Sequence, residues 1–207
     1  LYVQERCNAE TFPNDEILPS AQVLLLYFIY NGTVEITTSQ ASKELGLTPT
    51  SISRASRQLE KLGLIQTMKT GKQKIIHSDS SPKELFERTQ QKLLNPVKKT
   101  VYIPKTCVTS ELLESGYFAL AHYTMLNVPQ IKCFATDSIS RWKDVMTNNL
   151  LDSENQMAVE MWRYNPHLLS KEDKVDELSL ALSLRDDADE RVEAAVDEML
   201  EKLWGKI

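Results

Sequence analysis

The stretch TPTSISRASRQLEKLGLI, residues 48–65, decides the fold expected for the first part of the chain. Thr48 can cap a helix, and Pro49 suits the first helical position, where its missing N–H would have no partner within the helix. Apolar residues then recur at steps of three and four, which places one face of a helix against a core: Ile52, Ala55, Leu59 and Leu62. Gly63 is a typical stop signal, so the pattern predicts an amphipathic helix over 49–62.

The other faces of this helix carry side chains that suit a polyanion. Serine hydroxyls can exchange hydrogen bonds with phosphates and base edges, and arginine can form a forked pair with phosphate or guanine. An α-helix fits the major groove of B-DNA, and its N-terminus favours phosphate. The predicted contacts to bases or phosphates are Ser51, Ser53, Arg54, Arg57, Gln58 and Lys61. The alternative is a surface helix whose charges are simply solvated.

The neighbouring segments favour the first interpretation. A short helix, TTSQASKELG, precedes a four-residue GLTP turn, with Ala41, Leu45 and Leu47 available for a core. After the helix, Leu64–Lys69 and Gln73–His77 are predicted strands joined by a short glycine turn, a β-hairpin pattern. Three lysines surround its tip and would hold a DNA backbone without reading sequence: Lys69, Lys72 and Lys74. Upstream, PSAQVLLLYFIYNG predicts a buried helix capped by Ser20 and stopped at Asn31-Gly32.

This order of elements resembles the winged helix–turn–helix of bacterial transcriptional regulators of the MarR-like kind. The resemblance covers residues 20–78, and LGLTPTSISRASRQLEKLGLI with the short wing is its most specific part. It implies that Thr48, Thr50, Ser51, Ser53, Arg54 and Arg57 face DNA and that the three lysines lie on the wing. MarR-like proteins flank this module with long dimerising helices, whereas this chain continues into a mixed α/β pattern.

The remainder of the chain alternates helical and extended patterns. SPKELFERTQQKLLNP predicts a helix with a Ser81–Glu84 capping box. The segments after it read as strand, short helix, buried helix, strand, short helix and strand: KKTVYIP, TSELLESG, YFALAHYTMLN, QIKCFAT, SISRWKDVM and QMAVEMWRY. From Lys174 the pattern is helical, and its last helix places Val192, Ala195, Met199 and Leu203 on one stripe. A winged helix followed by SGYFALAHYTMLNVPQIKCFAT is similar to antitoxins of type IV toxin–antitoxin systems, which implies a protein partner.

Charge is distributed unevenly along the chain. The net charge of the 207 residues is −5, yet residues 21–76 hold seven Lys/Arg and three Asp/Glu, which gives +4. Residues 150–207 hold seven Lys/Arg and fifteen Asp/Glu, which gives −8. Because a basic segment can bind a polyanion within an acidic chain, the overall acidity does not exclude DNA.

Other classes of function find little support in the sequence. The three cysteines, Cys7, Cys107 and Cys133, form no CxxC pair and are expected to be free thiols. The three histidines are not spaced for a metal, and His122 reads as a core residue. The acids of RDDADE, residues 185–190, suit a helix start better than a calcium loop. No nucleotide-binding or hydrolase motif occurs, and the tryptophans read as core or interface anchors.

The sequence therefore predicts an α+β protein with an N-terminal winged helix–turn–helix, a mixed α/β domain and an acidic C-terminal helix. The expected divisions are a lead-in at 1–19, the DNA-binding domain at 20–78, a linker helix at 79–96 and an effector or interaction domain at 97–207. The expected function is sequence-specific binding of double-stranded DNA by a cytoplasmic prokaryotic regulator, as a homodimer. The alternative is an antitoxin-like protein whose C-terminal domain binds a partner protein. No enzyme activity, cofactor, metal, signal peptide or membrane span is expected.

Overall fold

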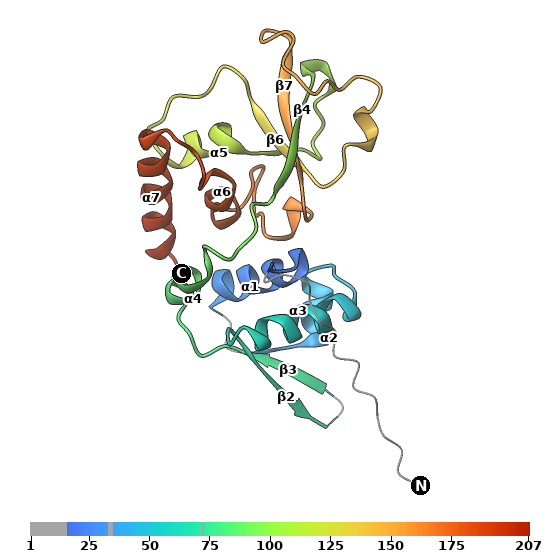
Figure 1. The fold of residues 1–207 in the computed structure, drawn as a ribbon, viewed down its shortest axis with the longest axis vertical. Coiled ribbons are helices and arrows are strands. Elements are labelled where there is room, and N and C mark those ends of the chain that lie inside the picture. The colour runs from blue at the N-terminus through green and yellow to red at the C-terminus, as the bar shows by residue number, and fades with distance from the viewer. Residues whose placement is uncertain (1–15, 33–34, 72) are drawn as a thin grey trace.

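The computed structural model describes residues 16–32, 35–71 and 73–207. Within these residues the chain forms seven α-helices and two β-sheets, which confirms the α+β class (Figure 1). The described residues up to 96 form the N-terminal lobe, and residues 97–207 form the C-terminal lobe. None of the helices in the described part of the chain combines the length and apolar character that a membrane crossing requires.

The described part of the N-terminal lobe combines four helices with a small antiparallel sheet. Its sheet has the strand order β1-β3-β2, and β2 and β3 form the expected hairpin. The pairing of β1 with β3, Glu35 opposite His77, was not predicted because a three-residue strand gives no usable period. The elements of the lobe are α1 (Pro19–Asn31), β1 (Glu35–Thr37), α2 (Thr38–Glu44), α3 (Pro49–Lys61), β2 (Gln66–Thr70), β3 (Gln73–His77) and α4 (Pro82–Thr89).

Helix α1 is buried on nearly all its sides, as its apolar sequence predicts. It lies between the α2–α3 pair below and the C-terminal lobe above (Figure 1). The expected cap was wrong: Leu18, not Ser20, holds the N-cap position, and no side chain caps the helix. The expected stop was right, because Gly32 adopts the left-handed conformation with φ of 52° at the C-terminal end.

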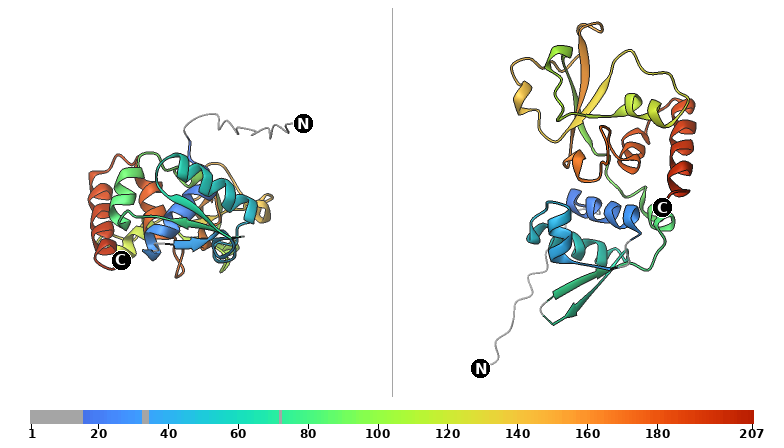
Figure 2. Two further views of the ribbon diagram at one scale, coloured as in Figure 1. Left: turned by 90° about the horizontal axis from the view of Figure 1, so that it is seen from below. Right: turned by 180° about the vertical axis from the view of Figure 1, so that it is seen from behind.

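The C-terminal lobe is built on a four-stranded mixed sheet with the order β4-β7-β6-β5. Strand β7 pairs antiparallel with β4 and parallel with β6, and helices α5, α6 and α7 lie on the side of the sheet toward α4 (Figures 1 and 2). The elements are β4 (Val97–Pro104), β5 (Leu113–Glu114), α5 (Gly116–Tyr123), β6 (Cys133–Thr136), β7 (Gln156–Trp162), α6 (Glu177–Leu184) and α7 (Glu190–Trp204).

Two predicted short helices in this lobe were wrong or too long. TSELLESG contains strand β5, because Leu113 and Glu114 pair with Ala135 and Phe134 of β6, and this tertiary pairing outweighs the local helical pattern. SISRWKDVM reduces to the single 3-10 turn Ser140–Trp142, where Trp142 is buried. The linker helix α4 is also shorter than predicted and ends before the Asn95-Pro96 stop.

The two lobes share a continuous hydrophobic core rather than meeting at a polar linker. The same buried cluster contains Leu24 and Leu26 of α1 together with Trp162 and Leu178 of the C-terminal lobe. Polar contacts seal this junction. The fully buried Gln22 of α1 donates across it to the hydroxyl of Tyr164 at 3.3 Å, and within the N-terminal lobe it exchanges hydrogen bonds with the backbone of Leu94 at 3.0 and 2.6 Å.

At the far end of α1, Tyr30 ties the lobes together a second time. Its hydroxyl donates to Asp176 at 2.9 Å and accepts from the backbone N–H of Leu178 at 2.8 Å. Burial raises the pKa of Tyr30 well above its usual value, so the phenol stays protonated and keeps donating to Asp176. These contacts hold α1 in one orientation against the C-terminal lobe.

Candidate nucleic-acid interface

The start of α3 has the geometry that its Thr-Pro sequence predicts. Thr48 is the N-cap, and its hydroxyl accepts a hydrogen bond from the N–H of Ser51 at 3.1 Å. Pro49 follows at the first position, where no N–H is needed. Thr48 and Thr50 are exposed, so this end of the helix, with its favourable dipole for anions, is open to solvent.

The two faces of α3 divide as predicted, with one exception described below. Ile52, Ala55 and Leu59 are completely buried against the lobe, whereas Leu62 is only half-buried beyond the last turn. The opposite face exposes Arg54, Arg57 and Lys61, and Ser51 and Ser53 are half-buried at its edge. Among the described residues, Arg54 and Lys61 have no ion-pair partner, so their charges face solvent uncompensated.

Gln58 was predicted to contact DNA, and this prediction was wrong. Its side chain is 5% exposed and lies between α3 and the chain entering α1. The amide accepts from the N–H of Leu18 at 2.8 Å and donates to the carbonyl of Glu16 at 2.9 Å. Gln58 therefore supplies the partner that the uncapped start of α1 lacks, which fixes α1 against α3 and removes Gln58 from the outer face.

The β2–β3 hairpin projects from the body of the N-terminal lobe (Figure 1). Lys69 and Lys74 lie directly opposite each other across the two strands, an arrangement of like charges that destabilises a hairpin on its own. Lys69 is exposed, while Lys74 is half-buried and donates to Ser56 of α3 at 3.3 Å. Lys74 thus faces the helix rather than extending outward. Lys72, the third predicted lysine, lies outside the described residues.

A cleft beside α3, which the sequence did not predict, is lined by residues of both lobes. It has a volume of about 530 Å³ and is lined from the N-terminal lobe by Ser20, Ser51 and Arg54. The C-terminal lobe contributes Asp137, which follows β6, and Arg163, which follows β7. No local pattern could have revealed this, because Arg54 and Arg163 are brought together only by the packing of the two lobes.

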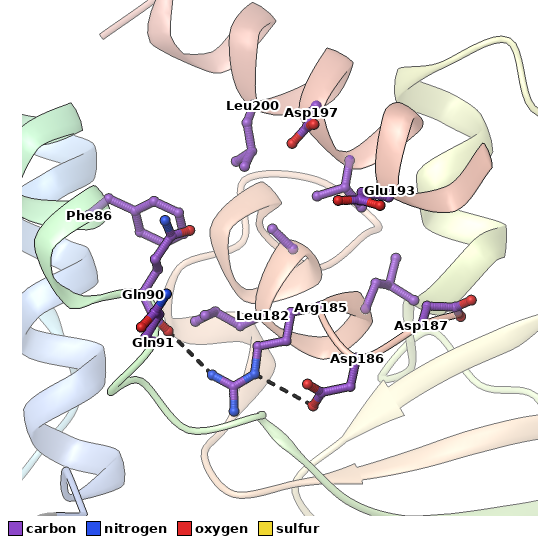
Figure 3. A pocket seen from close by; sticks show the side chains of 13 residues that line it. Phe86, Gln90, Gln91, Leu182, Arg185, Asp186, Asp187, Glu193, Asp197 and Leu200 are labelled. Atoms are coloured by element: carbon purple, nitrogen blue, oxygen red, sulfur yellow. Dashed lines mark hydrogen bonds and ion pairs between the residues drawn. The ribbon is translucent and has the colours of Figure 1, made fainter. Parts of the chain in front are cut away.

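A larger groove of about 670 Å³ lies between α4, α6 and α7 (Figure 3). Its floor includes Phe86 and Leu182, and Leu200 of α7 forms part of the wall. Four acidic side chains also line it: Asp186, Asp187, Glu193 and Asp197. Arg185 crosses the base, donating to the carbonyl of Leu93 at 2.6 Å and pairing with Asp186 at 3.6 Å.

Histidine and cysteine side chains often take part in catalysis or metal binding, so their surroundings bear on the candidate site. His122, predicted to lie in the core, is exposed instead and pairs with Glu114 at 2.7 Å. Cys107 and Cys133 are free thiols, as predicted, and burial raises the pKa of Cys133 well above its usual value; Cys7 lies outside the described residues. In the part of the chain that the structure describes, no group of three His, Cys, Asp or Glu side chains is placed to hold a metal.

The tryptophans and the acidic segment match their predicted roles. Trp142 and Trp162 are buried, and the ring of Trp204 packs on Phe86 with the centroids 5.7 Å apart. The acids before α7 mark a helix start, because Asp189 is the N-cap and accepts from the N–H of Arg191 at 3.0 Å.

Comparison with known proteins gives no relative: no family model, no curated protein and no solved structure matches the chain significantly.

Proposed function

We propose that residues 20–78 act as a winged helix–turn–helix and that the protein is a prokaryotic, cytoplasmic transcriptional regulator that binds double-stranded DNA. The observation that carries this proposal is the outer face of α3. It presents Arg54, Arg57 and Lys61 to solvent beside an open helix N-terminus, while its apolar face is completely buried. The resemblance of this segment to MarR-like regulators also supports the proposal.

In this proposal α3 enters the major groove and α2 braces it. Thr50, Ser51 and Ser53 are short enough to let the helix approach the groove closely, and Arg54 can form a forked pair with guanine or phosphate. Arg57 and Lys61 are further along the helix and suit the phosphate backbone. The protein would work as a homodimer, with two α3 helices reading half-sites about 34 Å apart or a multiple of that distance.

The hairpin supports the same proposal through its charge. Lys69 and Lys74 repel each other across the strands, and a nearby phosphate would offset this repulsion. Lys74 is held toward α3 by Ser56, so a backbone contact there would adjoin the helix. Lys69 is the more exposed of the two and would contact the flanking backbone.

DNA binding is tested by fluorescence anisotropy with duplexes from the protein's own promoter region. Affinity should fall with salt by about 0.9 log unit per phosphate contact for each tenfold rise in salt concentration. The double variant Arg54→Ala/Arg57→Ala should weaken binding by at least about tenfold and flatten the salt dependence. Lys98→Ala/Lys99→Ala removes the same charge from exposed positions of β4 and serves as the matched control. Unchanged affinity in the first variant would contradict the proposal.

A second candidate function is favoured by the groove in Figure 3. A groove lined by apolar side chains and by four carboxylates suits a basic amphipathic segment of a partner protein, as the similarity to type IV antitoxins also implies. Glu193 and Asp197 have no ion-pair partner among the described residues, so their charges are available to such a segment.

The type IV antitoxins that this chain is similar to are partnered with nucleotidyltransferase toxins, so this second candidate is tested with the product of a neighbouring nucleotidyltransferase-like gene. Co-purification of that protein with this chain should be lost in Glu193→Lys/Asp197→Lys, because the reversed charges repel a basic partner. Asp144→Lys/Glu154→Lys makes the same charge change at exposed positions outside the groove and should leave co-purification intact. Failure of the wild-type chain to retain the neighbour would exclude this candidate.

A further inference from the structure

The cleft beside α3 is formed by both lobes, and its two cations come from distant parts of the sequence. Arg54 belongs to the outer face of α3, and Arg163 directly follows the last residue of β7. The volume of about 530 Å³ is larger than a water site and large enough for a small ligand. Any group bound here would touch both lobes at once.

The charges that line the cleft are not balanced within the protein. The side chain of Arg54 has no hydrogen bond or ion pair among the described residues. Arg163 donates through Nε to the carbonyl of Asn95 at 3.1 Å, a neutral acceptor that fixes the side chain and leaves its charge uncompensated. Asp137 is the single acid among the described residues that line the cleft, so its local charge is +1.

The remaining lining is largely apolar but includes two serine hydroxyls, of which that of Ser51 lies 2.9 Å from the hydroxyl of Thr48. Ser20 lies in the first turn of α1, which starts without a side-chain cap, and Ser51 lies in the first turn of α3. Both first turns carry the partial positive charge of a helix N-terminus. Two arginines, two hydroxyls and two helix starts therefore border one cleft, and each of them favours an anion with several oxygen acceptors.

We propose that this cleft binds a phosphate group, held between Arg54 and Arg163. Arginine matches phosphate oxygens through its planar set of donors, and a fixed arginine loses little freedom on binding. The phosphate has two possible sources with the same chemistry: the backbone of bound DNA, or a free phosphorylated small molecule. In the second case the ligand occupies Arg54 and competes with DNA for it, a consequence that rests on the proposed function, whereas the anion site itself does not.

Three variants test the site: two should weaken phosphate binding, and one should strengthen it. Arg163→Gln and Arg54→Gln each remove a cation and should weaken phosphate binding by about tenfold or more, as expected for a lost charge-assisted hydrogen bond. Asp137→Asn removes the opposing charge and should strengthen binding several-fold. Because a damaged fold cannot produce tighter binding, the third variant separates an effect on the site from an effect on folding.

The probes are inorganic phosphate, titrated by calorimetry against a chloride reference at equal ionic strength, and a short mixed-sequence DNA duplex, followed by anisotropy. Arg88→Gln and Asp144→Asn make the same charge changes at exposed positions outside the cleft and should leave both probes unaffected. Thermal melting of every variant verifies that the fold is retained.

The two sources give different patterns. For a free ligand, inorganic phosphate binds the wild type, responds to all three variants and weakens binding of the duplex. For the DNA backbone, inorganic phosphate fails to bind, while Arg163→Gln weakens duplex binding and lowers the salt slope by about 0.9. If the duplex does not bind at all, the proposed function fails, and the phosphate titration alone decides whether the cleft is an anion site. The site is disproved if Arg163→Gln and Asp137→Asn change neither measurement.

Discussion

At the residue scale, buried polar side chains determine which predicted contacts are available. Gln58 and Gln22 both lie inside the protein and bond to backbone groups of other segments. Asp176 is also buried; its Oδ1 accepts from Ser179 and Tyr30, while its Oδ2 has no hydrogen-bond partner among the described residues. These three residues join segments that are distant in sequence. Their contribution to the free energy of unfolding depends on how completely their polar atoms are hydrogen-bonded.

Gln58→Ala is expected to lower the free energy of unfolding by about 1–3 kcal/mol, because it leaves the N–H of Leu18 and the carbonyl of Glu16 without their partner. Urea unfolding monitored by circular dichroism measures this loss. Gln73→Ala, at an exposed position of β3, is the control and should be close to neutral. A Gln58→Ala variant of normal stability would show that this bridge is not needed.

The stability of the protein should depend on pH through Asp176. Burial raises the pKa of this carboxyl, and hydrogen bonds from Ser179 and Tyr30 only partly offset that rise. The ionised carboxylate therefore costs stability above its folded pKa, and the cost disappears once pH falls below the unfolded value of about 3.9. Relative to Asp176→Asn, the wild type should gain stability as the pH is lowered from neutral toward that value.

Urea unfolding of the wild type and of Asp176→Asn across this pH range tests the direction of the change in stability. Asn at position 176 can still cap α6, so the comparison isolates the charge. Asp197→Asn removes an exposed carboxylate of α7 and should show no comparable trend. A constant difference between wild type and Asp176→Asn would mean that Asp176 has the same pKa in both states.

At the element scale, amphipathic helices were the most predictable parts of the chain. The stripe on α7 is buried as predicted, with Val192, Ala195, Met199 and Leu203 all in the main core. Helix α3 begins at the predicted residue and ends one residue early. Hydrophobic periodicity predicts these two helices well because each has one buried face and one solvated face along its length. The prediction failed for strand β5, because its two residues are extended only through their pairing with β6.

Met199→Ala should lower the free energy of unfolding by about 2–5 kcal/mol, because Met199 is 1% exposed and its truncation leaves a cavity under α7. Glu201→Ala lies two residues away on the exposed face and should change stability by less than about 0.5 kcal/mol. Denaturant unfolding of the two variants makes the comparison. Equal stabilities would show that α7 does not contribute to the cooperative core.

At the scale of the whole molecule, the shared core makes the two lobes one folding unit. Helix α1 has apolar side chains in contact with both lobes, so separating them would expose it to water. The sequence predicted a domain boundary at 78 and a linker helix to 96. The chain does pass through α4 there, yet the buried cluster continues across it from Phe86 to Leu203.

The full chain is therefore expected to unfold in a single transition. All three tryptophans belong to the C-terminal lobe, and Trp162 and Trp204 also pack at its junction with the N-terminal lobe. Their fluorescence therefore reports on the C-terminal lobe and the junction, while far-ultraviolet circular dichroism reports on the helices and strands of both lobes. The two signals should give the same denaturant midpoint. Separate midpoints, or a soluble and folded fragment of residues 16–80, would show that the N-terminal lobe is stable without the C-terminal one.

The sequence by itself determined the α+β class, the succession of helices and hairpin in 19–77, and the division of α3 into a buried and a charged face. These features follow from local periodicity, caps and glycine stops, which act over a few residues. Only the tertiary structure decided that Gln58 turns inward, that His122 is exposed and that Arg54 and Arg163 border one cleft. Such contacts join residues far apart along the chain, and they depend on how the lobes pack rather than on any local pattern.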